Sequence, residues 1–120
     1  EDPIVLNNLA WLLRTDDPER ATQYAEKAVE LTSQADPKTL DTLGMILTET
    51  GQAERGAALL KMATEKNPAD PTLQYHHAVA LEKIGQTEEA RDAAGRALSK
   101  PDAFPERAEA EALLQRLKQK

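Results

Sequence analysis

The stretch LDTLGMILTETGQAERGAALL, residues 40–60, decides the fold, because it places a glycine inside a helical pattern. Its apolar residues recur at intervals of three and four, the spacing of an amphipathic helix, and Gly44 lies within that stripe. A glycine inside a helix costs about 0.5–1 kcal/mol relative to alanine. The position therefore predicts a close approach of two helices, where a larger side chain would hold the backbones apart.

The same pattern recurs 34 residues away on both sides of this stretch. Gly44 aligns with Ala10 in one direction and with Ala78 in the other, so a small residue stands at the same place three times. A period of this length is typical of stacked helix pairs, each of which buries its apolar face against its neighbours. The residues that we expect to be buried for structural reasons are Leu9, Ala10, Leu43, Gly44, Ala78 and, in a second helix, Ala90.

Aspartate–proline pairs and glycines indicate where the helices begin and end. Asp36 and Asp70 each precede a proline, which places an N-capping carboxylate before a residue that has no N–H to satisfy. Gly51 and Gly85 suit the left-handed residue that follows a helix end, whereas the first unit turns at residues 15–18 without a glycine. We therefore expect helices at about residues 4–15, 18–32, 37–50, 53–66, 71–84, 87–99 and 105–118.

These features together resemble the tetratricopeptide repeat family. The resemblance rests on the 34-residue period, on the small residues at positions 10, 44 and 78, on Ala90 and on Pro68 at a unit end. It implies one all-α domain over residues 1–120, a right-handed α-solenoid of helix-turn-helix repeats with a C-terminal capping helix. The expected repeats cover about residues 3–36, 37–70 and 71–102, and the capping helix covers about residues 105–118.

Composition and missing motifs argue against several function classes. The net charge of −6 disfavours binding to nucleic acid, which requires a basic face. The chain has no cysteine and no apolar run long enough to insert into a membrane. We find no nucleophile–base arrangement and no glycine-rich phosphate loop, so we expect no catalytic residue, no cofactor and no enzyme.

The candidate binding residues lie on the side of the first helices that lines a concave groove in the resembling family. Trp11 falls outside the leucine stripe, so it is either a groove residue or a contact of a preceding repeat. Positions such as Thr42, Thr72 and His76 offer no basic clamp, so we expect a partner segment with an apolar anchor rather than an acidic C-terminus. The proposed groove residues are Asn7, Trp11, Arg14, Asp41, Met45, Glu49, Tyr75, Val79 and Glu82.

His76 and His77 are the only histidines of the chain. Adjacent residues on a helix point roughly 100° apart, so the two rings cannot share a metal as an i, i+4 pair can. Because His77 aligns with Leu9 and Leu43, we expect it to be a partly buried, hydrogen-bonded structural residue. We expect no metal site.

The leading functional hypothesis is a protein–protein interaction scaffold that binds a protein or peptide partner in its groove. Segments such as NNLAWLL at residues 7–13 and FPERAEA at residues 104–110 also resemble the C-terminal repeats of bacterial lipoproteins linked to exopolysaccharide production and to the sorting of proteins with a PEP motif. That resemblance implies an envelope location, whereas the residues themselves leave the location open.

Two alternatives remain from the sequence. The chain opens abruptly at Glu1, which suggests a piece of something longer. One alternative is that it is the terminal segment of a longer repeat array and mainly stacks or self-associates through its N-terminal edge. The other alternative is a regulatory repeat domain beside an enzyme or a transporter.

Overall fold

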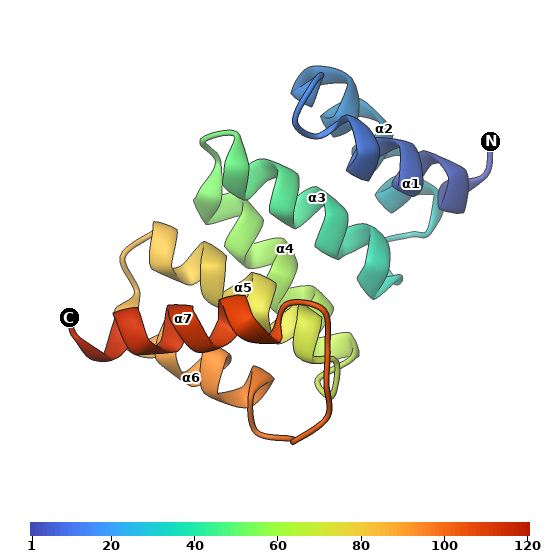
Figure 1. The fold of residues 1–120 in the computed structure, drawn as a ribbon. Helices are drawn as coiled ribbons and strands as arrows, with labels where there is room; N and C mark the ends of the chain where they lie inside the picture. The colour runs from blue at the N-terminus through green and yellow to red at the C-terminus, as the bar shows by residue number, and fades with distance from the viewer.

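The computed structural model describes all 120 residues, which form seven α-helices that pair in sequence order (Figure 1). The first, third and fifth helices each pack antiparallel against the helix that follows, the three pairs stack side by side, and the seventh helix has no following partner. The helices are α1 (Pro3–Leu13), α2 (Pro18–Leu31), α3 (Pro37–Glu49), α4 (Ala53–Lys66), α5 (Pro71–Lys83), α6 (Thr87–Ala97) and α7 (Arg107–Lys118). This architecture confirms the expected all-α repeat fold.

The helix ends follow the local chemistry that the sequence indicates. The carboxylates of Asp36 and Asp70 accept hydrogen bonds from backbone N–H groups of the first turn, each at 2.9 Å. Gly51 and Gly85 adopt φ angles of 92° and 82°, the left-handed region that glycine tolerates best. Asp2, which the sequence analysis did not single out, caps α1 in the same way, since its carboxylate accepts from the N–H of Ile4 at 2.8 Å.

Three predicted boundaries are wrong by two residues. Helix α6 ends at Ala97 instead of residue 99, because Leu98 already takes the C-cap position. Helix α1 ends at Leu13 instead of residue 15, because the chain turns there toward the capping residue Asp17. Helix α7 begins at Arg107 instead of residue 105, because Pro105 lies in the preceding turn and Glu106 takes the N-cap position.

Gly44 lies where α3 and α4 come closest together, as its place in the apolar stripe predicts. A Cβ atom on Gly44 would lie 2.7 Å from Cγ of Leu60 and 3.2 Å from the carbonyl oxygen of Gly56. The approach is two-sided, since a Cβ on Gly56 would lie 2.6 Å from the carbonyl oxygen of Gly44. The hydroxyl of Thr48 donates to that same carbonyl at 2.7 Å. The two helices therefore meet backbone to backbone.

Most of the expected structural residues are buried, but Leu9 is not. Leu43, Ala10, Ala78 and Ala90 are at most 2% exposed, whereas Leu9 is 39% exposed. Leu43 lies in a core cluster with Val29 of α2, so this register packs against the second helix of the preceding pair. No helix of the structure lies on that side of α1, which leaves Leu9 uncovered.

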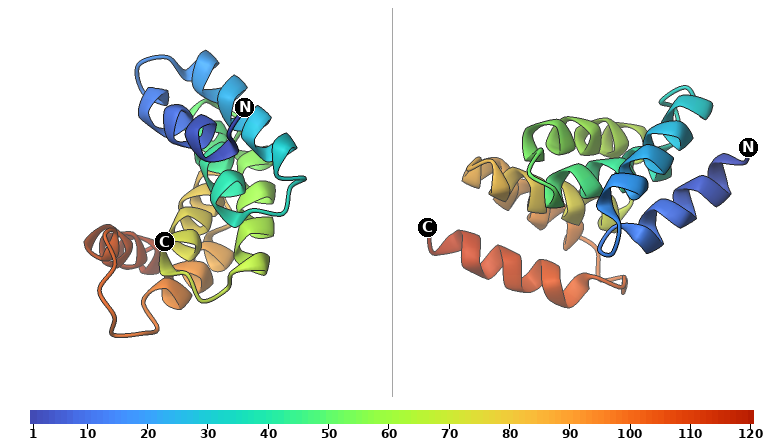
Figure 2. Two further views of the ribbon diagram at one scale, coloured as in Figure 1. Left: turned by 90° about the vertical axis from the view of Figure 1, so that its right-hand side faces the viewer. Right: turned by 90° about the horizontal axis from the view of Figure 1, so that it is seen from above.

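Helix α7 covers the end of the stack, as expected of a capping helix. Its buried residues Ala110, Leu113 and Leu117 face the last pair, and both leucines join a core cluster with Ala93 and Ala94 of α6. Figure 2 shows that α1 and α7 project on the same side of the stack, with α3 and α5 set back between them. No helix has the length and apolar character that crossing a membrane requires.

Candidate functional site

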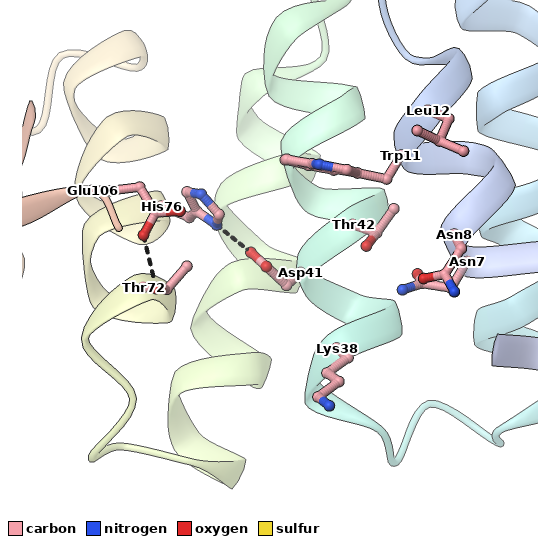
Figure 3. Close-up of a pocket in the computed structure, with 10 residues that line it drawn as sticks. All are labelled: Asn7, Asn8, Trp11, Leu12, Lys38, Asp41, Thr42, Thr72, His76 and Glu106. Atoms are coloured by element: carbon pink, nitrogen blue, oxygen red, sulfur yellow. Dashed lines mark hydrogen bonds and ion pairs between the residues drawn. The ribbon is translucent and has the colours of Figure 1, made fainter. Parts of the chain in front are cut away.

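A hollow of about 600 Å³ lies on the side of the stack that the odd-numbered helices share (Figure 3). It combines apolar surface from Trp11 and Leu12 with amide, hydroxyl, carboxylate and ammonium groups. All four odd-numbered helices contribute, because α7 supplies its N-cap residue. The lining residues are Asn7, Asn8, Trp11 and Leu12 of α1, Lys38, Asp41 and Thr42 of α3, Thr72 and His76 of α5, and Glu106.

Trp11 forms one wall of the hollow. Its indole extends from α1 over α3 toward α5, with the ring centroid 6.2 Å from that of His76. The guanidinium of Arg14 lies 3.8 Å from the indole centroid, a cation–π contact that fixes the ring from one side. Trp11 thus faces the following repeats, so the alternative in which it packs against a preceding repeat is wrong.

His76 and Asp41 form a hydrogen-bonded pair across α5 and α3. Nδ1 of His76 donates to Oδ1 of Asp41 at 2.7 Å, and both side chains are largely buried. Burial alone would lower the pKa of His76, but the hydrogen bond to Asp41 and the negative charges of Asp41, Glu106 and Glu49 raise it above its usual value of 6.5. The pair therefore ties two repeats together with a charge-assisted contact at the base of the hollow.

The remaining polar side chains of the hollow differ in whether they already have a hydrogen-bond partner. The hydroxyl of Thr72 donates to Glu106 at 2.8 Å, which ties α5 to the start of α7. Oδ1 of Asn7 is buried under neighbouring protein atoms without a hydrogen-bond partner. Lys38 adds one exposed cation at the edge.

Three of the nine proposed groove residues, Asn7, Trp11 and Asp41, line this hollow. Met45 is wrong as a surface residue, because it is 6% exposed in a core cluster with Leu60 and Ala80. The repeat position that Met45 shares with Trp11 faces the first helix of the next repeat. That helix covers the methionine fully and the larger tryptophan only in part. Trp11 packs at the border of that same cluster.

The proposed groove residues of the third repeat do not line the hollow, because α7 packs against the face of α5 that carries them. Tyr75 and Val79 are half-buried and pack with the cluster that contains Leu113 and Leu117. Glu82 is already paired, since Arg116 donates to its two oxygens at 3.0 and 2.8 Å. The hydrogen bond from Arg116, together with the positive charges of Arg116 and Lys120, lowers the pKa of Glu82.

The hollow also contains residues that the sequence analysis did not propose, namely Asn8, Leu12, Lys38 and Glu106. The 34-residue period could have indicated three of them, Asn8, Lys38 and Glu106. Residues 8, 42 and 76 form one register and residues 38, 72 and 106 form another, and each of these six lines the hollow. Of the other two proposed residues, Arg14 stacks on Trp11, while Glu49 is exposed at the end of α3 without lining the hollow.

His77 is buried like His76 but differs from it in hydrogen bonding and in pKa. It is buried as expected, but Nδ1 has no hydrogen-bond partner, so the expectation of a hydrogen-bonded residue is wrong. Burial, together with the positive charges of Arg96 and Lys61, lowers the pKa of His77 to about 4. No group of three or more potential ligand side chains is arranged to hold a metal ion.

A titration can test the opposite environments of the two histidines. In NMR titrations of the ring protons we expect the pKa of His76 above 6.5 and that of His77 near 4. Asp41→Asn should lower the pKa of His76, because burial then acts without the carboxylate, and should leave that of His77 unchanged as an internal control. An unchanged pKa of His76 in this variant would show that the pair is absent in solution.

The pair of His76 and Asp41 also predicts how the stability of the protein changes with pH. Because the folded-state pKa of His76 is raised above 6.5, its contribution to stability is complete below pH 6.5 and is lost as the pH rises through that raised pKa. The difference in unfolding free energy between the wild type and Asp41→Asn should therefore shrink on going from pH 6 to pH 9. Urea unfolding followed by circular dichroism measures this difference at each pH.

Comparisons with known proteins identify the fold. No protein-family model matches the chain, and no curated protein sequence matches it. Solved structures do match. The Yersinia enterocolitica type III secretion chaperone SycD, in complex with a peptide of the translocator YopD, aligns with a TM-score of 0.80 and 19% identity, over 95% of this chain and 90% of that one.

Two further structures extend the comparison. The first TPR of Spaghetti (RPAP3), bound to an HSP90 peptide, aligns with a TM-score of 0.84 and 16% identity, over 98% of this chain and 90% of that one. YrrB, described as a TPR protein with an unusual peptide-binding site, aligns with a TM-score of 0.77 and 22% identity, over all of this chain and 58% of that one. The chain therefore has a tetratricopeptide-like helical repeat fold.

The likeness also extends to one enzyme. Thermobaculum terrenum O-GlcNAc transferase aligns with a TM-score of 0.84 and 21% identity, but this chain covers only 22% of its length. That match concerns a minor part of the enzyme and shows the fold alone.

Proposed function

We propose that the chain is a scaffold that binds an extended or helical segment of a protein partner in the hollow beside Trp11. The observation that carries the proposal is the hollow itself, which gathers side chains from α1, α3, α5 and the start of α7. A segment lying across it would contact all three repeats at once. Such an extended surface, built from side chains that the core does not use, is what stacked helix pairs provide for recognition.

The chemistry of the hollow favours a segment with an apolar anchor. Trp11 and Leu12 provide the apolar wall against which a large apolar side chain can pack. The carboxylates of Asp41 and Glu106 stand opposite a single ammonium group, Lys38, so the hollow has no basic clamp for an acidic terminus. We therefore infer that the partner contributes a neutral or basic segment with one large apolar side chain.

The structural comparisons support a peptide partner by analogy. SycD is described in complex with a peptide of YopD, and the RPAP3 repeat is described with an HSP90 peptide. Both are proteins of the same fold, with 19% and 16% identity to this chain, so their partners are not carried over. What the likeness supports is the mode of binding, in which a short segment lies along a repeat stack.

The narrower placement in a bacterial envelope or exopolysaccharide assembly rests on sequence resemblance alone. None of the compared structures supports it, so it remains a hypothesis about context and adds nothing to the binding proposal.

The test uses the single tryptophan of the chain as the reporter. Peptides selected from a displayed random library against the full chain are synthesised and titrated while the emission of Trp11 is recorded. Asn8→Arg places a long side chain at an exposed position of the hollow and should weaken binding at least tenfold. Gln23→Arg introduces the same side chain at an exposed position of α2 that does not line the hollow, and should leave the affinity unchanged.

Two results would contradict the proposal. One is that no selected peptide changes the emission of Trp11. The other is that Asn8→Arg and Gln23→Arg bind a selected peptide equally well, which would move the binding surface away from the hollow.

A further inference from the structure

A second depression, of about 610 Å³, lies between α4 and α6, with α5 as its floor. It is separate from the hollow, because the two share no lining residue. The twist of α5 explains the separation, since adjacent residues of a helix point roughly 100° apart. His76 therefore lines the hollow, while His77 lines the second depression, which we call the outer groove. Its volume is typical of a site for a small molecule.

The floor of the outer groove is polar where the preceding repeat has leucine. Gln74 stands 34 residues after Leu40, and both are at most 4% exposed. His77 stands 34 residues after Leu43, and both are at most 8% exposed. Burying an amide and an imidazole costs free energy that a leucine does not cost. Because leucines at these positions are sufficient for stacking in the preceding repeat, the two polar residues indicate a role other than packing.

Gln74 fixes the orientation of a guanidinium group at this end of the groove. Its Oε1 accepts a hydrogen bond from Nε of Arg96 at 3.1 Å, and its amide nitrogen donates to the carbonyl oxygen of Pro68 at 3.1 Å. Arg96 is thereby held through Nε, so that its two terminal nitrogens stay available. A guanidinium presented in this way can bind both oxygens of a carboxylate.

Two cations flank His77 at this end, Arg96 from α6 and Lys61 from α4. Neither takes part in any ion pair of the structure. Burial lowers the pKa of His77, and the positive charges of Arg96 and Lys61 lower it further to about 4, although the negative charge of Glu65 acts in the opposite sense. The imidazole is therefore uncharged at neutral pH, and the two cations are free to receive an anion.

The other end of the floor is apolar. Leu81 and Ile84 lie four and seven residues after His77, so all three share one face of α5, and Ala57 of α4 lines the same end. Seven residues of helix span about 10 Å. The outer groove therefore leads from a cationic end to an apolar end over a length that suits a short carbon chain.

We propose that the outer groove binds a small carboxylic acid with a short apolar tail. Its carboxylate lies between Arg96 and Lys61, and its tail lies along Leu81 and Ile84. A carboxylate fits better than a phosphate, because the rim of the groove carries acidic side chains and the chain has a net charge of −6. Both repel a doubly charged anion more strongly than a singly charged one. The acidic residues of the rim are Glu54, Glu65 and Glu89.

The probe is hexanoate, titrated into the full chain at neutral pH and constant ionic strength while NMR spectra of the ring protons and methyl groups are recorded. We expect saturable shifts of the ring protons of His77 and of the methyl groups of Ile84. The ring of His76 lines the hollow and should not shift, which gives an internal control. Hexanamide has the same tail without the charge and should bind at least tenfold more weakly.

Variants separate binding from folding. Arg96→Gln and Lys61→Gln each remove one exposed cation of the groove and should weaken the binding of hexanoate at least fivefold. Lys66→Gln makes the same charge change at an exposed position of α4 that does not line the groove, and should bind like the wild type. Gln74→Leu introduces the residue of the preceding repeat, so it should weaken binding without lowering the melting temperature.

Three results would overturn the proposal. One is the absence of saturable shifts at His77 and Ile84. Another is equal binding of hexanoate and hexanamide, or of Arg96→Gln and Lys66→Gln to hexanoate, since the cations would then play no part. The third is saturation of the groove by inorganic phosphate but not by hexanoate, which would contradict the carboxylate.

Discussion

Gly44→Leu should lower the unfolding free energy by about 3 kcal/mol, at the upper end of the usual cost of overpacking. The first atom of any side chain at this position already lies 2.7 Å from Cγ of Leu60 and 3.2 Å from the backbone oxygen of Gly56. The side chain of Leu60 can rotate, but the backbone of α4 cannot move without separating the two helices. Urea unfolding followed by circular dichroism gives the free energy, and thermal unfolding gives an independent check.

Gly95 provides the control, because it lies in α6 with no atom within 4 Å of the Cβ that it lacks. Gly95→Ala should stabilise the protein by about 0.5–1 kcal/mol, since alanine costs less than glycine in a helix. A variant Gly44→Leu that melts like the wild type would show that α3 and α4 do not approach closely in solution.

The repeat architecture could be predicted because each of its signals has a local physical cause. A glycine inside a helix signals a close contact between helices. In the structure Gly44 does lie at such a contact, against Gly56 of α4. Aspartate before proline signals a helix start, and Asp36 and Asp70 make the expected capping bonds. The period then relates one repeat to the next, so that a feature identified once is identified in all three.

The binding surface could be predicted only in part, because it depends on how the helix pairs are rotated relative to one another. The register of Trp11 continues in Met45 and Val79, and the sequence analysis placed all three in the groove. In the structure the next first helix covers this register, so that Met45 is buried and Val79 packs with the cluster under α7. The adjacent register, which includes Thr42 and His76, faces the hollow instead.

Pairings between repeats were not visible from the sequence for a related reason. Asp41 and His76 are 35 residues apart, and Glu82 and Arg116 are 34 apart, so each pair joins one first helix to the next. Either residue alone resembles an ordinary exposed charge on a helix. Only the stacking of the helices brings the partners within hydrogen-bond distance. The same stacking converts Glu82 from a proposed groove residue into an anchor for α7.

Leu43→Ala should have the other large effect, a loss of about 2–5 kcal/mol, which is the usual cost of truncating a buried leucine. Leu43 is 2% exposed and lies in the main core cluster with Val29, Leu40 and Leu47, so the removed atoms leave a cavity between two repeats. The chain offers a matched comparison at the same register, because Leu9 stands 34 residues earlier on α1 and is 39% exposed.

Leu9→Ala should therefore cost about 1 kcal/mol or less, since the surrounding water already contacts much of the side chain. The two variants have identical chemistry and differ only in whether a second helix lies over the leucine. Both are measured by urea unfolding at the same protein concentration. Equal losses would mean that Leu9 is covered in solution, and a loss of a few tenths of a kcal/mol at Leu43 would contradict the packing of α3 against α2.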